Sequence, residues 1–203
     1  MLFYRCSRAL FRLVAAPLFR FRVVGVERIP REGAAVIVAP HRSWLDPACV
    51  GGACPRPIRF LVMERVYHTP RTHWFYRGTR TIPVAPDGSD SIRALRSALR
   101  ALRAGELVGV FPEGRVFTDA KPGPLHPGAA LLAVQSGVPV IPMFIRGSSD
   151  AWPHHKRYPT PAPVSVHVGN AIDPPGRKGR EAVDDMVRRI ENAWRELADE
   201  EER

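Results

Sequence analysis

The chain has 203 residues, 45% of them hydrophobic and 25% charged, a composition that is ordinary for a folded globular protein. This length suffices for one well-buried domain and is short for two. The charge balance is unusual, because 30 Lys and Arg against 20 Asp and Glu give a net charge of +10. A basic surface suits nucleic acid, anionic lipid or phosphorylated substrates, so charge alone does not choose among these partners.

The three cysteines, Cys6, Cys49 and Cys54, are odd in number and show no C-x-x-C spacing. This pattern argues against a disulfide framework and against a zinc site, and it favours a reducing compartment. The adjacent His154 and His155 have no cysteine or carboxylate at ligand spacing nearby. We therefore expect no metal site.

The amino-terminal segment, residues 1–22, carries five arginines and no acidic residue. Its apolar runs are shorter than the roughly 18 residues needed to span a bilayer. At about 100° per residue, Arg5, Arg8 and Arg12 share one sector of a helix. The opposite sector holds Leu2, Phe3, Cys6, Leu10, Leu13 and Val14. This pattern is typical of an amphipathic helix in the membrane interface, and we expect such a helix before a domain over residues 23–203.

Two other interpretations of this segment stay open. Its apolar side would pack on the core of the domain, as in most amphipathic helices. Alternatively it would be a targeting peptide, although it lacks a clear hydrophobic region and a small-residue cleavage site.

The rest of the chain alternates strand and helix patterns, which predicts one α/β domain with a mixed, largely parallel sheet flanked by helices. Pro139 and Pro142 interrupt one apolar run and predict an edge strand or a bulge there. The expected strands are 34–39, 59–63, 107–111, 138–145 and 164–168. The expected helices are 47–53, a segment from Ser89 or Asp90 to Gly105, 126–136, and one that starts at Arg180.

Chemistry-bearing residues follow two of these strands. His41 and Asp46 come directly after the strand at 34–39, and Glu113-Gly114-Arg115 come after the strand at 107–111. Ligand sites of α/β sheets lie outside the carboxyl ends of strands. A histidine that shares a proton with a carboxylate is the usual general base for a hydroxyl. The two strand ends therefore outline a site for an anionic substrate.

These motifs resemble those of the glycerolipid acyltransferase family, which includes lysophosphatidic acid acyltransferases. His41 and Asp46 form its H-x-x-x-x-D motif, and residues 111–115 form its F-P-E-G-R motif. The resemblance spans about residues 22 to 150, with the motifs in the family's order. Its lead-in strand, second motif and fourth motif are similar to residues 24–30, 78–86 and 138–142. The resemblance implies a glycerol-phosphate-acyltransferase-like fold.

The resemblance also implies a reaction. The enzyme would move a fatty acyl chain from acyl-CoA or acyl-carrier protein to the free hydroxyl of lysophosphatidic acid, giving phosphatidic acid for phospholipid biosynthesis. His41 would remove the hydroxyl proton, and Asp46 would hold the imidazole and stabilise its cation. No cofactor beyond the thioester co-substrate is needed. Ser43 stands close enough in sequence to His41 to leave a covalent serine mechanism as an alternative.

In the family, the Glu–Gly–Arg region is tied to glycerol phosphate, which implies that Glu113, Gly114 and Arg115 bind the substrate. Arg115 has a planar fork suited to phosphate oxygens, and Glu113 would hold a hydroxyl or anchor Arg115. Alternatively, Glu113 and Arg115 only pin the loop by an ion pair.

The chain departs from the family pattern at two places. Many members that use lysophosphatidic acid carry an arginine in the second motif, which residues 84–86 lack. Such members also carry an arginine two places after the glycine of the F-P-E-G motif, whereas Arg115 follows Gly114 directly. This form resembles the branch that acylates lysophosphatidylethanolamine. Arg80 would compensate for the missing arginine, and Arg42 and Ser43 are further substrate-binding candidates.

The expected partners are a lysophospholipid acceptor, an acyl thioester donor and a membrane surface, with no nucleic acid. We expect a peripheral protein on the cytoplasmic face of the cell membrane, bound through the amino-terminal helix. One alternative is an acyltransferase for another lysolipid, such as lysophosphatidylethanolamine. The other is a non-catalytic basic module for lipid or nucleic acid, which leaves the His41–Asp46 pair unexplained.

Overall fold

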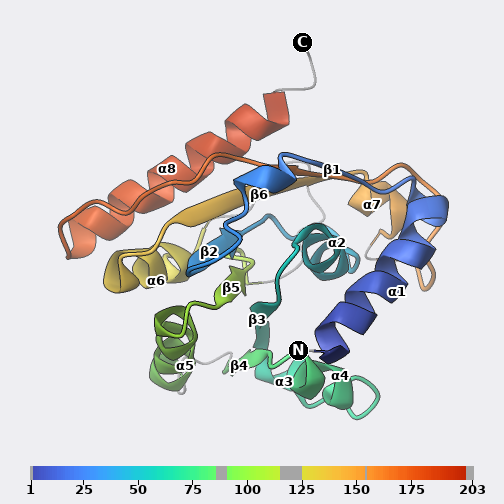
Figure 1. Cartoon of the computed structure of the whole chain (residues 1–203), viewed down its shortest axis with the longest axis horizontal. Coiled ribbons are helices and arrows are strands. Elements are labelled where there is room, and N and C mark those ends of the chain that lie inside the picture. The colour runs from blue at the N-terminus through green and yellow to red at the C-terminus, as the bar shows by residue number, and fades with distance from the viewer. Residues whose placement is uncertain (1, 86–90, 115–124, 154, 200–203) are drawn as a thin grey trace.

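The computed structural model describes residues 2–85, 91–114, 125–153 and 155–199. Within them the chain forms one seven-stranded sheet with the order β1-β7-β6-β2-β5-β3-β4 (Figure 1). Neighbouring strands are parallel except β6 and β7, which are antiparallel. The strands are β1 (Arg22–Val24), β2 (Ala35–Val38), β3 (Ile58–Met63), β4 (Ile82–Val84), β5 (Leu107–Val110), β6 (Val140–Arg146) and β7 (Ser165–Val168). This architecture confirms the predicted mixed, largely parallel sheet.

Helices cover both faces of the sheet (Figure 1). They are α1 (Leu2–Phe19), α2 (Asp46–Ala53), α3 (Glu64–Tyr67), α4 (His73–Gly78), α5 (Ser91–Arg103), α6 (Gly128–Ser136), α7 (Ser148–Ala151) and α8 (Arg180–Asp199), with the short 3-10 helix η1 (Val26–Arg28). The central strands β2 and β5 are buried at every residue. Strands covered on both faces have to be apolar throughout rather than alternating, which explains their continuous hydrophobic runs.

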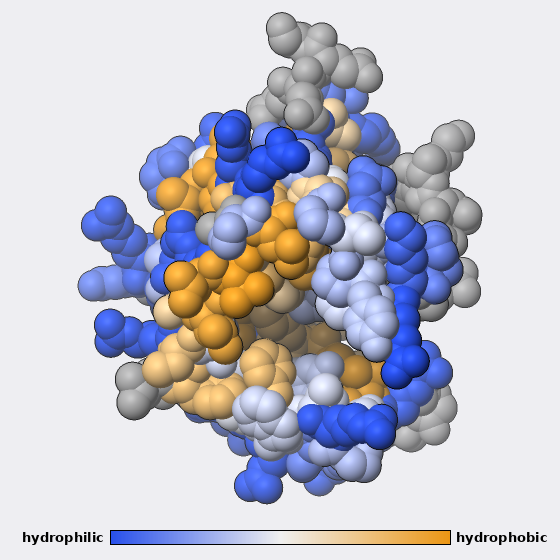
Figure 2. Space-filling model, turned by 90° about the vertical axis from the view of Figure 1, so that its right-hand side faces the viewer, coloured by the Kyte–Doolittle hydropathy of each residue, from blue (hydrophilic) through white to orange (hydrophobic). Residues whose placement is uncertain are grey.

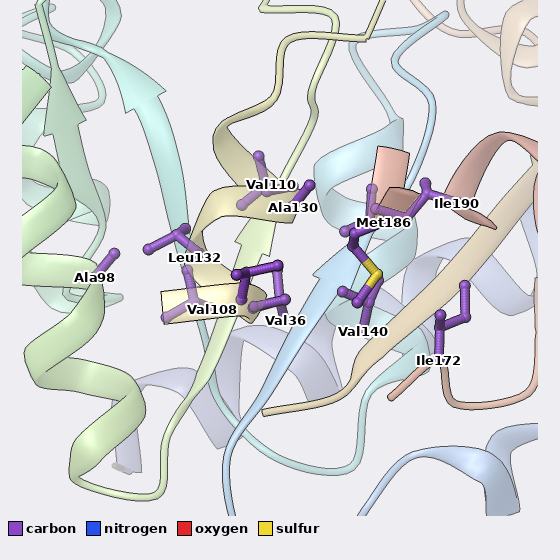
Figure 3. Packing of buried hydrophobic residues seen from close by; sticks show 14 of the residues in the cluster. Val36, Ala98, Val108, Val110, Ala130, Leu132, Val140, Ile172, Met186 and Ile190 are labelled. Atoms are coloured by element: carbon purple, nitrogen blue, oxygen red, sulfur yellow. The ribbon is translucent and has the colours of Figure 1, made fainter. Parts of the chain in front are cut away.

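Two apolar layers hold the sheet between its helices. On one face, β2, β5 and β6 pack against α5, α6 and α8, as Figure 3 shows for Val36 and Val108 opposite Leu132. On the other face, Ile37 and Ile141 pack with residues of α1 and α2. We call these the α6 face and the α2 face. The site described below lies at the carboxyl edge between them.

Pro139, which precedes β6, and Pro142 within it do not place this strand at an edge of the sheet. Strand β6 lies between β2 and β7, and its Pro142 pairs in register with Val38. On the other side, the ladder with β7 ends at the pair Met143 and Val168, and the next bridge joins Val140 to Ile172. Proline has no backbone N–H to donate to a neighbouring strand. Because the β6–β7 ladder is interrupted opposite Pro142, no hydrogen bond is lost there, and an interior strand can contain this proline.

Helix α1 is attached to α2 through polar and aromatic side chains. The Tyr4 hydroxyl donates to the Gly51 carbonyl at 3.2 Å, and Arg8 Nε donates to the Gly52 carbonyl at 3.3 Å. These carbonyls belong to the last turn of α2, where no intrahelical donor is available. The Phe11 ring lies directly over Gly52, in the space that a Cβ atom would need. Arg8 therefore caps α2 and does not share an exposed sector with Arg5 and Arg12.

The other side of α1 stays uncovered. Leu10, Leu13 and Val14 are 63%, 74% and 52% exposed, whereas Ala15 and Phe19 are buried in the α2 face. Packing on the domain thus accounts for one side of the helix and leaves an apolar stripe on the other. Among the described residues, no helix has the length and hydrophobicity needed to cross a bilayer.

Candidate active site

The site is built on His41, which lies three residues beyond the end of β2. Its side chain is 16% exposed, and its Nδ1 lies 3.1 Å from Oδ2 of Asp46. Asp46 is the first residue of α2 and is almost fully buried. A carboxylate in the first turn of a helix is stabilised by the helix dipole. The spacing of five residues therefore lets a turn and a helix start bring base and acid together.

The Asp46 carboxylate is held in place by the loop that it closes. Its Oδ2 also accepts the backbone N–H groups of Arg42 and Ser43, each at 2.7 Å. An ionised carboxylate only accepts hydrogen bonds, so His41 donates from Nδ1, and in the neutral imidazole Nε2 is then the nitrogen without a proton. Nε2 is therefore the atom that can take a proton from a substrate hydroxyl.

Glu113 positions the base from the neighbouring strand. Val38 pairs with Val110, so His41 and Glu113 each stand three residues past the same level of the sheet. The Glu113 Oε2 atom accepts the backbone N–H of His41 at 2.6 Å, and the residue is only 2% exposed. The expected hydroxyl-binding carboxylate thus spends one of its oxygens on the histidine backbone. Gly114 follows with a φ of +68°, a conformation that side chains rarely adopt.

An aromatic column continues from the base toward the α2 face. The His41 imidazole stacks on Phe111 with centroids 4.5 Å apart, and Phe111 stacks on Phe60 at 5.8 Å. A Cβ atom at Gly109 would collide with the Phe60 ring. Phe60 was not among the site residues that the sequence motifs predicted. The glycine inside the apolar run of β5 was its signal, because such a glycine marks a close approach.

Ser43 is brought close to His41 but faces the interior. It is fully buried, its hydroxyl donates to the Trp152 carbonyl at 2.7 Å, and its Oγ accepts the Leu45 N–H at 3.1 Å. The first hydrogen bond ties the loop to the end of α7, and the second closes the turn within the loop itself. A hydroxyl held in this way is not available as a nucleophile or as a substrate ligand, which removes the basis of the covalent serine mechanism.

Arg80 does not belong to the site. It pairs with Glu106 at 2.8 Å, and Glu106 directly precedes β5. His41 lies beyond the opposite, carboxyl end of the parallel strands, and the four residues of β5, at roughly 3.3 Å each, separate the two ends by about 13 Å. The prediction that Arg80 compensates for the missing arginine is therefore wrong, because Arg80 lies at the amino edge of the parallel strands and His41 at their carboxyl edge. Arg115 lies outside the described residues.

The two buried cysteines are unsuited to nucleophilic chemistry. Cys49 and Cys54 are buried, and burial raises the pKa of both thiols above the ordinary range. A thiol kept neutral is a poor nucleophile. Across the described ranges, no group of three or more His, Cys, Asp and Glu could hold a metal ion.

A histidine base and a carboxylate that orients it, on rigid elements, suit proton removal from a hydroxyl as that hydroxyl attacks a carbonyl. This fold and site define an O-acyltransferase of the histidine–aspartate type. The Acyltransferase family model matches residues 20–146, and the chain belongs to this family, as the motifs predict.

Relatives cover most of the chain. It is 29% identical over 189 residues to a 1-acyl-sn-glycerol-3-phosphate acyltransferase of Pseudomonas aeruginosa, covering 91% of this chain and 70% of the relative. An enzyme of the same name from Bacillus subtilis is 25% identical, over 71% of each chain. The crystal structure of the 1-acyl-sn-glycerophosphate acyltransferase PlsC from Thermotoga maritima superposes with a TM-score of 0.82 at 26% identity, covering 98% of this chain and 80% of that one.

Proposed function

We propose that the enzyme transfers a fatty acyl chain from acyl-CoA or acyl-carrier protein to the free hydroxyl of lysophosphatidic acid, yielding phosphatidic acid. The observation that carries this proposal is the His41–Asp46 pair, which leaves Nε2 as a base at the carboxyl edge of the sheet. The names of the relatives from three bacteria support the choice of acceptor.

The reaction follows from the tautomer of His41. The acceptor oxygen attacks the thioester carbonyl while Nε2 takes its proton, and Asp46 stabilises the resulting imidazolium. When the tetrahedral intermediate collapses, the carbon–sulfur bond breaks and the thiolate receives the proton from Nε2. The base returns to its starting state, and a positioned base of this kind contributes roughly 10²–10⁴-fold to the rate.

The enzyme would act at the cytoplasmic face of the membrane. The exposed apolar residues of α1 lie on the same side of the molecule as α4, since Phe3 contacts Trp74 and Phe75 with ring centroids 5.9 Å apart. Figure 2 shows hydrophobic residues gathered around a hollow on this side. We call Leu10, Leu13, Val14, Trp74 and Phe75 the docking face.

Charge around the docking face supports an anionic lipid surface. Arg5 and Arg12 of α1 and Arg71 and Arg77 near α4 are exposed. An arginine close to an anionic leaflet contributes about 1 kcal/mol to binding, and tryptophan favours the interfacial region. The amphipathic helix and the short aromatic helix would thus dip into one leaflet together.

The first test is thiol release from palmitoyl-CoA on liposomes, with and without lysophosphatidic acid. Wild type should release thiol in an acceptor-dependent way, and His41→Ala should abolish this release. His68→Ala is the control, because this histidine is 58% exposed on its side chain and contacts Glu64, Tyr67 and His73 around the short helices α3 and α4. Release that ignores the acceptor would contradict the proposed acceptor, and a panel with lysophosphatidylethanolamine would then follow. No release from folded protein would overturn the proposal.

A further inference from the structure

Arg42 directly follows the base in sequence, and its guanidinium has no hydrogen-bond or ion-pair partner in the described part of the chain. Its backbone N–H is bound to Asp46 at 2.7 Å, which holds the residue next to His41. Its guanidinium lies over the Phe144 ring, 5.4 Å from the centroid. The Nε atom is buried and makes no hydrogen bond to any described residue. A guanidinium has five N–H donors, so the Arg42 guanidinium has donors available for a ligand.

Other partly buried arginines of the domain are used within the fold. Arg56 donates to three backbone carbonyls, and Arg59 binds Glu106. Arg146 also lies near the Phe144 ring, at 5.8 Å, and donates to carbonyls in the last turn of α8. Two cations therefore meet one ring, and one of them is tied to a helix end. Arg42 is left to bind an anion.

The position of Arg42 matches the headgroup end of a lysophospholipid. Phe144 belongs to the apolar layer of the α6 face, whereas Phe60 and Phe111 pack against the layer of the α2 face. The His41 imidazole thus has a cation toward one face of the sheet and an aromatic column toward the other. A lysophospholipid hydroxyl likewise lies between a phosphate and an acyl chain.

We propose that Arg42 binds the phosphate group of the acceptor and makes the enzyme specific for phosphorylated lysolipids. This inference rests on the proposed function for the identity of the acceptor. Arginine suits the task because its planar fork makes two parallel hydrogen bonds to phosphate oxygens. Stacking on Phe144 holds the fork in place and leaves its edge for the ligand.

The kinetic test compares Arg42→Gln and Arg42→Lys with wild type at saturating palmitoyl-CoA. Both variants keep the backbone N–H that Asp46 binds. Arg42→Gln should raise the KM for lysophosphatidic acid about 10–100-fold with little change in kcat, because a charge-assisted contact is lost. The rate with monoacylglycerol, which lacks the phosphate, should stay as it is. Arg42→Lys should recover part of the affinity, and Arg96→Gln on the exposed side of α5 should behave as wild type.

Two outcomes would overturn the proposal. A KM increase for palmitoyl-CoA rather than for the acceptor would assign Arg42 to the phosphates of the donor. An equal loss with lysophosphatidic acid and monoacylglycerol would make Arg42 a structural residue.

A binding measurement separates this proposal from the proposed function. Phosphorus NMR line widths of glycerol 3-phosphate should report binding to His41→Ala, which does not turn over, and no binding to the double variant with Arg42→Gln. This result would support the phosphate site even if lysophosphatidic acid were not the acceptor. Equal binding to both variants would refute the role of Arg42 even if acyl transfer were observed.

Discussion

Replacing Glu113 tests whether this residue holds the base or the acceptor. In Glu113→Ala the His41 backbone N–H loses its acceptor at 2.6 Å. The lost contact is a buried hydrogen bond to a charged group, worth about 1.5–3 kcal/mol. Glu113→Gln keeps an amide oxygen that can accept the same N–H. The charged and neutral forms of the bond differ by about 1 kcal/mol, or roughly fivefold.

The consequence for catalysis follows from geometry. A displacement of about 1 Å at the reacting groups can cost 10²-fold in rate, so we expect kcat to fall about 10²-fold in Glu113→Ala and less than tenfold in Glu113→Gln. The KM for lysophosphatidic acid should change little in either variant, because the carboxylate is buried and its Oε2 accepts the His41 backbone N–H. Initial rates of thiol release over a range of acceptor concentrations measure both constants.

The reasoning would be refuted by one pattern of results. If Glu113 holds the acceptor hydroxyl, both variants should raise the KM for the acceptor to a similar extent, and Glu113→Gln should give no protection of kcat. Circular dichroism and thermal unfolding of each variant show whether a loss of rate reflects unfolding.

Two further predictions concern α1. Leu13→Glu should weaken binding to anionic vesicles about tenfold or more and leave the melting temperature unchanged, since a Leu side chain contributes about 1.5–3 kcal/mol on full burial. Vesicle sedimentation measures the binding, and Ile92→Glu, at a similarly exposed position on α5, should bind as wild type. Gly52→Ala places a methyl group in the space of the Phe11 ring and should lower the free energy of unfolding by about 1–3 kcal/mol. Gly128→Ala, with open space around it, should have a melting temperature no lower than that of wild type. Equal melting temperatures for the two glycine variants would contradict the close packing of α1 on α2.

Helix α1 and the His41–Asp46 pair are connected through α2. Helix α1 carries the exposed stripe of the docking face, and its Tyr4 and Arg8 cap the last turn of α2. The first residue of the same helix is Asp46. The base is therefore supported by an element that α1 holds directly, which makes the amino-terminal helix part of the domain and not an appendage.

The sequence by itself determined the features that depend on neighbouring residues. Continuous apolar runs identified the buried parallel strands. The spacing of His41 and Asp46 predicted that their side chains meet, because one turn and one helix start suffice to bring them together. Even the capacity of the first helix for an exposed apolar stripe was visible in its periodicity. Such short-range patterns need no knowledge of the rest of the chain.

Only the tertiary structure decided which distant residues meet. Glu113 reaches the His41 backbone across 72 residues of sequence because β5 lies beside β2, and Arg80 is excluded because parallel strands send it to the opposite edge. Ser43 is turned inward by Trp152, and Arg42 is turned toward Phe144 by the same loop. Strand order and helix packing set these contacts. Both arise from the burial of apolar surface over the whole domain, so no single sequence motif predicts them.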